Sequence, residues 1–167
     1  MNPNLSVKIG QLKLKNPVLV CSGTFGYAEE FMDFMDLKKL GAIVTKTITL
    51  NPRKGNLSPR TCETPCGMLN SIGLDNPGLK LFIDEKLPYL SKIGSPIIVS
   101  IASEGNPEEF ITLTKQLDKI NTIAAIELNI SCPNIKKLYS SPVSQHSRQT
   151  GKPANRQTGK LRSGKFI

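Results

Sequence analysis

Short apolar runs and amphipathic segments alternate along most of this chain. Residues 17–21 and 96–102 are almost wholly apolar and open into polar residues, and residues 42–47 run from three apolar residues into Thr45, Lys46 and Thr47. Such runs are typical of strands that are buried on both faces. Residues 124–130 alternate apolar side chains with Glu127 and Asn129, which fits a pleated strand. We therefore expect four strands, each followed by a polar loop.

The segments between these runs have helical spacing. Phe31, Met35 and Leu37 predict a helix that stops at Leu40 and Gly41. Residues 78–93 predict a second helix, in which only Pro88 disturbs an apolar face. A third helix is expected to open at Pro107, because a first-turn proline followed by acidic residues suits a helix amino end.

Two other segments stand outside this alternation. Residues 5–16 alternate apolar and polar positions on either side of Gly10 and Gln11, which predicts a small β-hairpin before the main fold. Residues 48–77 are rich in proline, glycine and asparagine and have no clear period. A connection of this length is usually functional, so we expect it to be ordered over a ligand.

Alternating strands and helices indicate an α/β fold with a parallel sheet and right-handed crossovers. Four such units could form half of an eight-stranded barrel or an open doubly wound sheet. No GxGxxG motif follows any of the strands, which counts against a dinucleotide-binding sheet.

The charge of the chain is concentrated near its end. Of the 22 basic residues, 14 lie within residues 1–135 together with all 13 acidic residues, so this part has a net charge of only +1. The remaining eight basic residues give residues 136–167 a charge of +8. Because this segment contains an eight-residue near repeat and no periodic apolar face, we expect a basic, disordered tail. An RNA-binding or membrane-surface arm is the alternative interpretation.

Composition excludes several classes of protein. The four cysteines come without a signal peptide and in a core-rich chain, so we expect a reduced, cytoplasmic protein rather than a disulfide scaffold. The CxxxC spacing of Cys62 and Cys66 lacks a second pair of ligands, and no metal site is expected. No apolar run approaches the ~20 residues that span a bilayer, which predicts a soluble protein.

The candidate chemistry is centred on residues 126–134. This segment runs from an apolar strand into a polar loop that contains Cys132, and Pro133 ends the strand because it has no backbone donor. Cys132 is thus expected at the carboxyl end of a strand, where α/β sheets and barrels carry their active sites. A cysteine packed as a small hydrophobe is the alternative.

Three motifs carry a resemblance to a known family. KTITL with Lys46, ETPCGMLNSIGLDNPG at 63–78 and ELNISCPN at 127–134 resemble, in this order and spacing, dihydroorotate dehydrogenase of class 1. The second motif is most similar to the catalytic subunit of the class 1B, NAD-linked enzyme. The resemblance covers residues 5 to about 135 and implies the first half of a (β/α)8 TIM barrel. The family's later glycine-containing loop and four further β–α units do not follow.

The resemblance also implies a reaction. Dihydroorotate would lose a proton from C5 and a hydride from C6 to FMN, forming orotate in pyrimidine biosynthesis. Cys132 matches the general base, and its ordinary pKa of about 8.5 suits proton abstraction. Lys46 matches the lysine between flavin and substrate, where a positive charge attracts the orotate carboxylate. A solvated lysine at a strand end is the alternative.

Further site residues follow from the same motifs. The asparagines that would grip the pyrimidine are Asn70, Asn129 and Asn134. The backbone expected to line the same pocket is that of Ser71, Ile72, Gly73 and Leu74. The residues implied as flavin contacts are Ser22, Lys46, Thr47, Ser100 and Asn129, although some relatives have asparagine in place of Ser100. An amide that holds a turn is the alternative for any one of these asparagines.

The implied partners are an electron-transfer subunit with an iron–sulfur cluster and FAD, which passes electrons to NAD. A full-length protein is expected to be a homodimer or heterotetramer that binds neither membranes nor nucleic acid. The chain as it stands is expected to be inactive alone. A non-catalytic remnant with a nucleic-acid-binding tail is the alternative from a different functional class.

Overall fold

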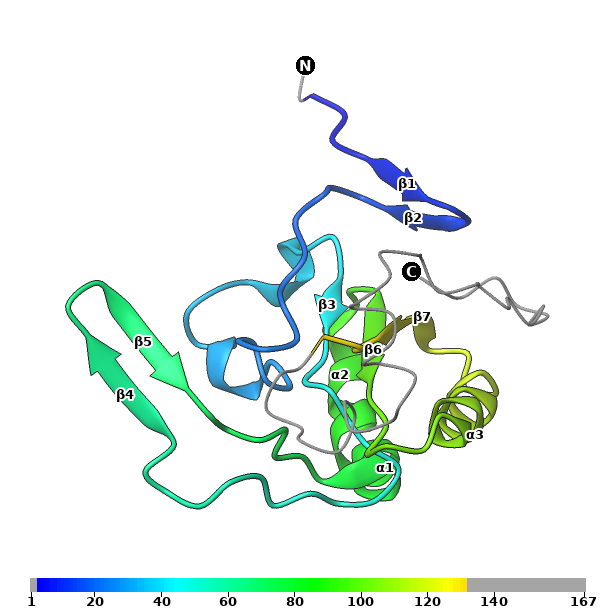
Figure 1. Cartoon of the computed structure of the whole chain (residues 1–167). Coiled ribbons are helices and arrows are strands. Elements are labelled where there is room, and N and C mark those ends of the chain that lie inside the picture. The colour runs from blue at the N-terminus through cyan, green and yellow to red at the C-terminus, as the bar shows by residue number, and fades with distance from the viewer. Residues whose placement is uncertain (1–2, 132–167) are drawn as a thin grey trace, which may run out of the picture.

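This computed structural model describes residues 3–131, whose centre is a parallel sheet (Figure 1). Its strands are β3 (Ile43–Val44), β6 (Ile97–Ile101) and β7 (Ile123–Leu128), in the spatial order β3-β6-β7. A single parallel bridge between Leu19 and Ala42 adds a fourth segment next to β3. The order along the sheet therefore follows the order in sequence, as expected for successive β–α units, and the predicted α/β class is confirmed.

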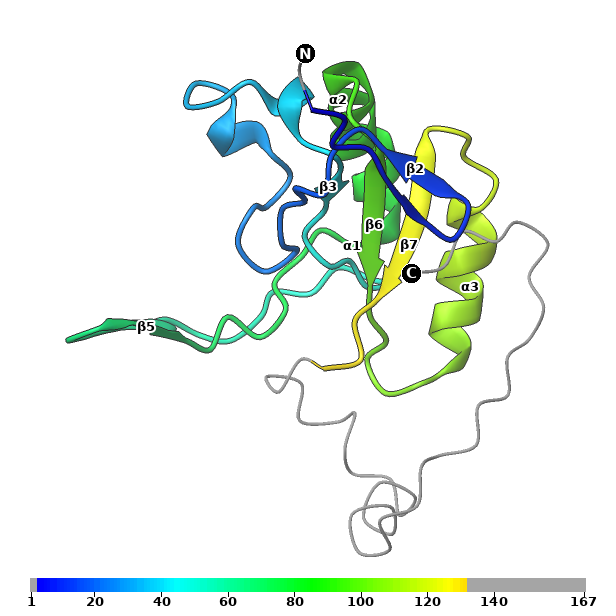
Figure 2. The same ribbon diagram turned by 90° about the horizontal axis from the view of Figure 1, so that it is seen from above.

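Helices cover one face of this sheet (Figure 2). Residues 78–93 form one continuous helical segment of α1 (Gly78–Leu81), a π-helical turn (Phe82–Lys86) and α2 (Leu87–Ile93). Pro88 cannot donate to the carbonyl of Asp84, and the wider turn lies next to it. α3 (Glu108–Leu117) follows β6, and its first turn carries the acidic residues Glu108 and Glu109. Two of the three predicted helices are therefore present.

The opposite face packs on the N-terminal hairpin. β1 (Val7–Ile9) and β2 (Leu12–Leu14) pair antiparallel, as the sequence predicts. Leu14 is buried in a cluster with the inward side chains of the sheet, which are Ala42, Val44, Ile98 and Ala125. The hairpin thus closes one end of this face.

Two of the expected elements are wrong. Residues 17–21 form only the Leu19 bridge, because the chain turns at once and the backbone N–H groups of Thr24 and Phe25 donate to the carbonyl of Cys21. The helix expected over residues 31–40 is replaced by two short 3-10 turns, Glu29–Phe31 and Leu37–Lys39. The helix-like spacing of apolar residues in this segment is misleading, because the residues do not share one buried face. The ring of Phe31 stacks on that of Phe25 with 4.2 Å between the ring centres, whereas Phe34 is 84% exposed.

One element was missed. Residues 48–77 contain a second hairpin, β4 (Thr61–Thr64) and β5 (Gly67–Asn70), which projects from the body of the molecule (Figure 1). Nearly every residue of both strands is exposed, so no buried face imposes an apolar alternation on the sequence.

Several expectations concern residues outside the described part. Cys132, Asn134 and the whole segment 136–167, with the tail predicted to be disordered, lie there. Among the described residues, no helix is long and apolar enough to cross a membrane.

Candidate functional site

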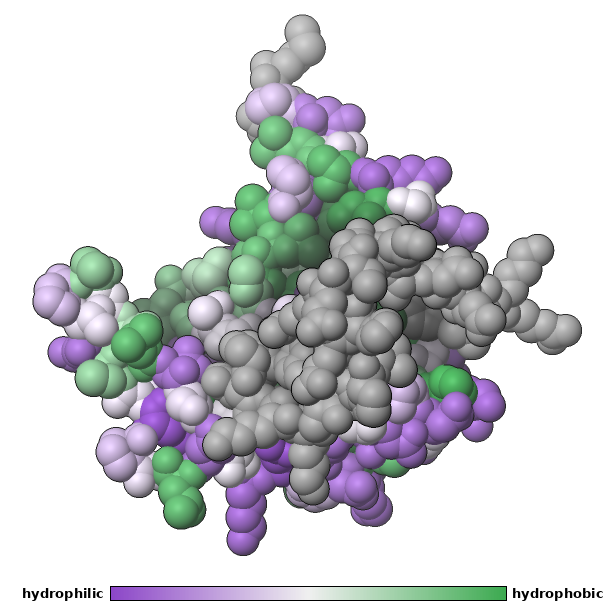
Figure 3. Space-filling view, in the orientation of Figure 1, coloured by the Kyte–Doolittle hydropathy of each residue, from purple (hydrophilic) through white to green (hydrophobic). Residues whose placement is uncertain are grey.

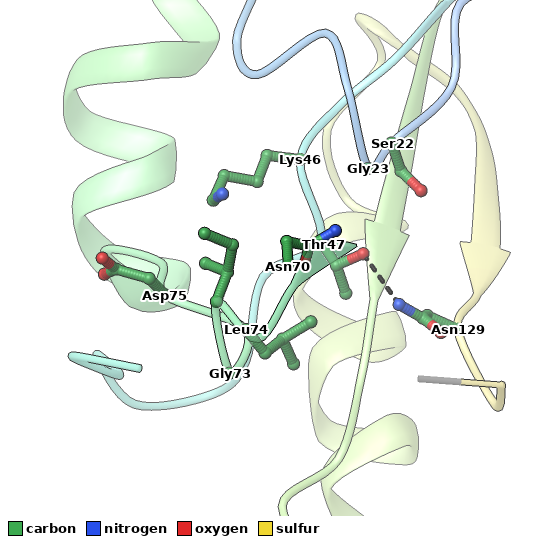
Figure 4. A pocket seen from close by; sticks show the side chains of 10 residues that line it. Ser22, Gly23, Lys46, Thr47, Asn70, Gly73, Leu74, Asp75 and Asn129 are labelled. Carbon is green, nitrogen blue, oxygen red and sulfur yellow. Dashed lines mark hydrogen bonds between the residues drawn. The ribbon is translucent and has the colours of Figure 1, made fainter. Parts of the chain in front are cut away.

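An open pocket lies at the carboxyl ends of the parallel strands (Figure 4). Together with solvent at its mouth, it encloses about 530 Å³ of empty space. Its walls are formed by Ser22, Gly23, Lys46, Thr47, Asn70, Ile72, Gly73, Leu74, Asp75 and Asn129. Segments that are far apart in the sequence therefore meet in one pocket, and eight of these ten residues are ones that the sequence indicated.

Strand geometry brings the first of these residues together. Lys46 lies two residues beyond β3, and its backbone N–H donates to the carbonyl of Gly26 over 2.8 Å. Asn129 directly follows β7, and its backbone N–H donates to Ile101 over 2.8 Å. Because both strands are parallel, their carboxyl ends share a rim, and Lys46 and Asn129 lie on it.

A chain of hydrogen bonds orients the Asn129 amide. Its Nδ2 donates to Oγ1 of Thr47 over 3.0 Å, and that hydroxyl lies 2.9 Å from Oγ of Ser100 (Figure 4 shows the first bond). Its Oδ1 accepts the backbone N–H of Ser131 over 3.3 Å. Thr47 and Ser100 are buried, so the Asn129 amide is held from the side of the protein core. Ser100, expected at the flavin, does not line the pocket and lies behind Thr47.

Lys46 supplies the positive charge of the pocket. Its side chain is half-buried and extends toward the side that carries Asp75 (Figure 4). The Asp75 carboxylate pairs with Arg60 over 2.9 Å, and none of the described residues forms an ion pair with Lys46. The ammonium is therefore available to an anionic ligand.

The loop over residues 72–75 is held from outside the pocket. Gly73 and Leu74 have positive φ angles of 76° and 60°. The Nε of Arg53 donates to the carbonyl of Gly73 over 2.7 Å, and the backbone N–H of Asn56 donates to Ile72 over 2.9 Å. A Cβ on Gly73 would lie 2.7 Å from the Asn56 side chain, so glycine is required there.

Asn76 is the buried anchor of this loop. Its Oδ1 accepts the backbone N–H groups of Thr49 and Gly78 over 3.0 and 2.9 Å. Its Nδ2 donates to the carbonyl of Leu74 over 2.8 Å and to Oγ1 of Thr49 over 3.0 Å. Sequence reasoning missed this role. An asparagine before proline and glycine reads as an ordinary turn, and no periodic pattern marks its burial.

Ser71 faces away from the pocket. The Nδ2 of Asn56 donates to the Ser71 carbonyl over 2.8 Å and lies 3.0 Å from its hydroxyl. Of the four residues at 71–74 that were expected to line the pocket, the structure thus brings Ile72, Gly73 and Leu74 to it. Asp75 and Gly23 line it without having been expected.

Tyr27 has a buried hydroxyl without a hydrogen-bond partner among the described residues. Its ring packs on Phe82 at 6.0 Å, with the Lys86 ammonium 5.8 Å from its centre. Burial, and then the carboxylates of Asp75 and Glu29, raise its pKa well above the ordinary value of 10.0. The folded state thus favours the protonated phenol.

We expect Tyr27→Phe to raise the free energy of unfolding by about 1 kcal/mol at neutral pH, because it removes a buried unsatisfied hydroxyl. In the parent, this phenol should lower stability as the pH rises above its ordinary pKa, where the unfolded chain loses a proton that the folded chain keeps. Urea unfolding at neutral and alkaline pH measures both effects. Tyr89→Phe is the control for the effect at neutral pH, since the Tyr89 hydroxyl bonds Sδ of Met32. A destabilised Tyr27→Phe would contradict this account.

Comparison with known proteins assigns these features to a family. The family model described as dihydroorotate dehydrogenase matches residues 4–150. Two curated relatives are catalytic subunits of dihydroorotate dehydrogenase B (NAD(+)). The one from Thermoanaerobacter pseudethanolicus is 54% identical over 80% of this chain and 44% of its own length. The one from Endomicrobium trichonymphae is 55% identical over 82% of this chain and 44% of its own length.

Structural comparison agrees on the fold. A crystal structure of DHODH from Eimeria tenella, in complex with ferulenol, superposes with a TM-score of 0.63 at 24% sequence identity. The match covers 83% of this chain and 39% of that chain. This chain therefore spans less than half the length of the relatives that it matches.

Proposed function

Because this chain belongs to the dihydroorotate dehydrogenase family, we propose that residues 1–135 form the substrate-binding half of an FMN-dependent barrel of class 1B. The complete barrel would oxidise dihydroorotate to orotate in pyrimidine biosynthesis, in the cytoplasm. The observation that carries this proposal is the pocket itself, in which Lys46, Asn70, Asn129 and the backbone of residues 72–74 line one space. Residues 136–167 would be a separate basic tail.

The polar groups of the pocket suit a flavin and a pyrimidine. Both rings present alternating carbonyl and N–H groups, and an asparagine amide supplies both a donor and an acceptor. FMN, when bound, would accept the hydride that leaves C6 of the substrate. Ser22, Lys46, Thr47 and Asn129 would contact the flavin, with Ser100 holding Thr47 from behind.

Lys46 and the asparagines would orient the substrate. The uncompensated ammonium of Lys46 would bind the substrate carboxylate beside the flavin. Asn70 would bind the ring edge from the end of β5, and Asn129 from the end of β7. Since Thr47 already fixes the Asn129 amide, little side-chain entropy would be lost when the substrate binds.

The remaining roles lie outside the described residues. Cys132 would remove the C5 proton, and Asn134 would add a further contact to the pyrimidine. Electrons would pass to NAD through a partner subunit with an iron–sulfur cluster and FAD, in a homodimeric or heterotetrameric assembly. The relatives' name, catalytic subunit, supports a separate electron-transfer subunit.

A single-chain chimera tests this function. In it, residues 1–135 replace the corresponding part of the T. pseudethanolicus relative. We expect the chimera to bind FMN tightly and to bleach it with dihydroorotate. The 167-residue chain alone should bind FMN weakly, because barrels of this kind commonly hold the phosphate at loops after strands seven and eight.

Lys46→Met in the chimera should weaken orotate binding by about tenfold or more, since a hydrogen bond to a charged group contributes about 1.5–3 kcal/mol. Lys115→Met, on the exposed side of α3, is the matched control and should leave binding unchanged. A chimera that folds but shows no dihydroorotate-dependent bleaching, or equal effects of the two variants, would overturn the proposal.

A further inference from the structure

A carboxylate lies in the wall of the candidate site, although the proposed substrate is an anion. Asp75 lines the same pocket as Lys46, and the Lys46 side chain extends toward the side that carries it (Figure 4). A carboxylate at this place competes with a bound anion for the ammonium group, and it also repels the anion directly. An anion can bind well here only if the charge of Asp75 is compensated.

Arg60 supplies this compensation from outside the pocket. Its Nη2 donates to Oδ2 of Asp75 over 2.9 Å, whereas Lys46 has no ion-pair partner within residues 3–131. The side chains of Arg60 and Asp75 are 32% and 38% exposed, so water screens this pair only in part. Arg60 is not among the residues that line the pocket, so it acts on a ligand there through the Asp75 carboxylate.

The guanidinium of Arg60 is held in place by the backbone around it. Its Nη1 donates to the carbonyls of Lys54 and Asn56, each over 3.4 Å. A Cβ added to Gly55, which has a positive φ of 69°, would lie 3.2 Å from this Nη1 and 3.0 Å from Cβ of Asp75. The ion pair therefore lies in a close-fitting slot beside Gly55, where the planar arginine fork binds the carboxylate and two carbonyls at once.

The ion pair joins the two segments that lead to the projecting β4–β5 hairpin. Arg60 directly precedes β4, and Asp75 ends the pocket loop that follows β5. The backbone N–H of Ser71 donates to the Arg60 carbonyl over 2.8 Å, so the two segments lie side by side. Hydrophilic residues gather on the surface where this hairpin joins the body of the molecule (Figure 3). The direction of the Asp75 carboxylate is therefore set mainly by its ion pair.

If the bond to Arg60 is lost, the Asp75 carboxylate can turn toward the inner side of the pocket. Its charge already acts on that side. Burial raises the pKa of the Tyr27 phenol, and the Asp75 carboxylate raises it further. The backbone N–H of Lys46 donates to Gly26, next to Tyr27, so the strand end that carries the ammonium lies there too. Lys46 is the cation that lines the pocket, and its charge attracts the released carboxylate.

We propose that Arg60 is a positioning residue of the candidate site. It neutralises Asp75 and holds this carboxylate away from Lys46, so that the ammonium stays free to bind the carboxylate of the substrate. The identity of this anion rests on the proposed function, whereas the competition of Arg60 and Lys46 for Asp75 does not. The two parts are therefore tested separately.

The first test measures the reactivity of the Lys46 amine in the 167-residue chain. Labelling with acetic anhydride, quantified for each peptide by mass spectrometry, reports the fraction of amine that is accessible and unprotonated. Arg60→Gln removes the charge but keeps an amide that can donate to the carbonyls of Lys54 and Asn56. We expect this variant to slow labelling of Lys46 by about threefold or more, because the released carboxylate stabilises the ammonium form. Adding Asp75→Asn should restore the parent rate.

Three further variants separate charge from structure. Arg60→Lys keeps a cation beside Asp75 and should label at Lys46 like the parent. Asp75→Asn alone should also label like the parent, because Arg60 already neutralises this carboxylate. Lys80→Met removes the partner of Asp84 in an exposed ion pair outside the pocket, and it should leave the rate unchanged.

Three outcomes of the labelling would each overturn the proposal. The first is an unchanged rate in Arg60→Gln or a slowing that Asp75→Asn does not reverse. The second is an equal slowing in Arg60→Lys, which would assign the effect to shape rather than charge. The third is a large increase in Asp75→Asn alone, which would mean that Asp75 acts on Lys46 even while Arg60 is present.

The second test is orotate binding to the single-chain chimera. Arg60→Gln should weaken binding by about fivefold, and the double variant with Asp75→Asn should bind like the parent chimera. A double variant as weak as Arg60→Gln would mean that the arginine supports the loop and not the charge of the site, and the proposal would fail. A chimera that binds no orotate would instead refute the proposed function, and the labelling result would still decide the role of Arg60.

Discussion

Cys132→Ser in the single-chain chimera should slow reduction of bound flavin by dihydroorotate by about a hundredfold or more at neutral pH. The variant should recover part of this loss as the pH rises. A thiol with an ordinary pKa of about 8.5 is partly ionised near neutral pH, and its thiolate can accept the C5 proton, whereas a serine hydroxyl ionises only at much higher pH. Stopped-flow absorbance of the flavin, measured across the pH range, gives the rate directly.

The control for this prediction is Cys66→Ser. Cys66 is exposed at the turn of the projecting β4–β5 hairpin, and it does not line the candidate pocket. Its replacement should leave the reduction rate unchanged at every pH. Equal rates for Cys132→Ser and the parent at neutral pH would remove Cys132 from the role of base.

Asn76→Ala in the 167-residue chain should lower the free energy of unfolding by about 3–5 kcal/mol. The change leaves the N–H groups of Thr49 and Gly78 and the carbonyl of Leu74 without their partner. Thr49 is fully buried and Asn76 is 6% exposed, so water replaces these bonds poorly. Each group left unsatisfied costs about 1–3 kcal/mol. Urea unfolding followed by circular dichroism measures the loss.

Asn106→Ala provides the comparison. The Asn106 side chain is exposed and accepts one bond, from the backbone N–H of Glu108 at the start of α3. Loss of this hydrogen bond should lower the free energy of unfolding by about 1 kcal/mol, as is usual for a residue that caps a helix start. If the two variants unfold at the same urea concentration, Asn76 is not the anchor of the pocket loop.

The hydrophobic pattern of the sequence is enough to predict those elements that are buried along a regular face. β6 and the helical segment 78–93 lie within a residue or two of the predicted runs, because their apolar side chains pack into the core. The N-terminal hairpin was also predicted, since Leu14 on one face is buried while Lys13 points away. The placement of Lys46 and Asn129 beyond β3 and β7 follows from the same reasoning.

The hydrophobic pattern does not predict elements that lack a buried face, because nothing then imposes a periodic spacing of apolar residues. The exposed β4–β5 hairpin has no apolar alternation from which it could be predicted. The helical spacing of Phe31 and Met35 predicts a helix where the chain forms two 3-10 turns. Helix spacing requires a continuous surface to pack against, whereas here Phe31 packs on Phe25 and Phe34 faces solvent.

The sequence by itself determined the α/β class, the strand ends that carry polar residues and the motifs that resemble the family. Only the tertiary structure decided which polar groups share a space. Ser100 lies beneath Thr47, Ser71 faces Asn56, and Asn76 joins the loop to Thr49. These contacts join residues 15 to 53 positions apart, and a hydrogen bond at such a separation depends on how the whole chain packs.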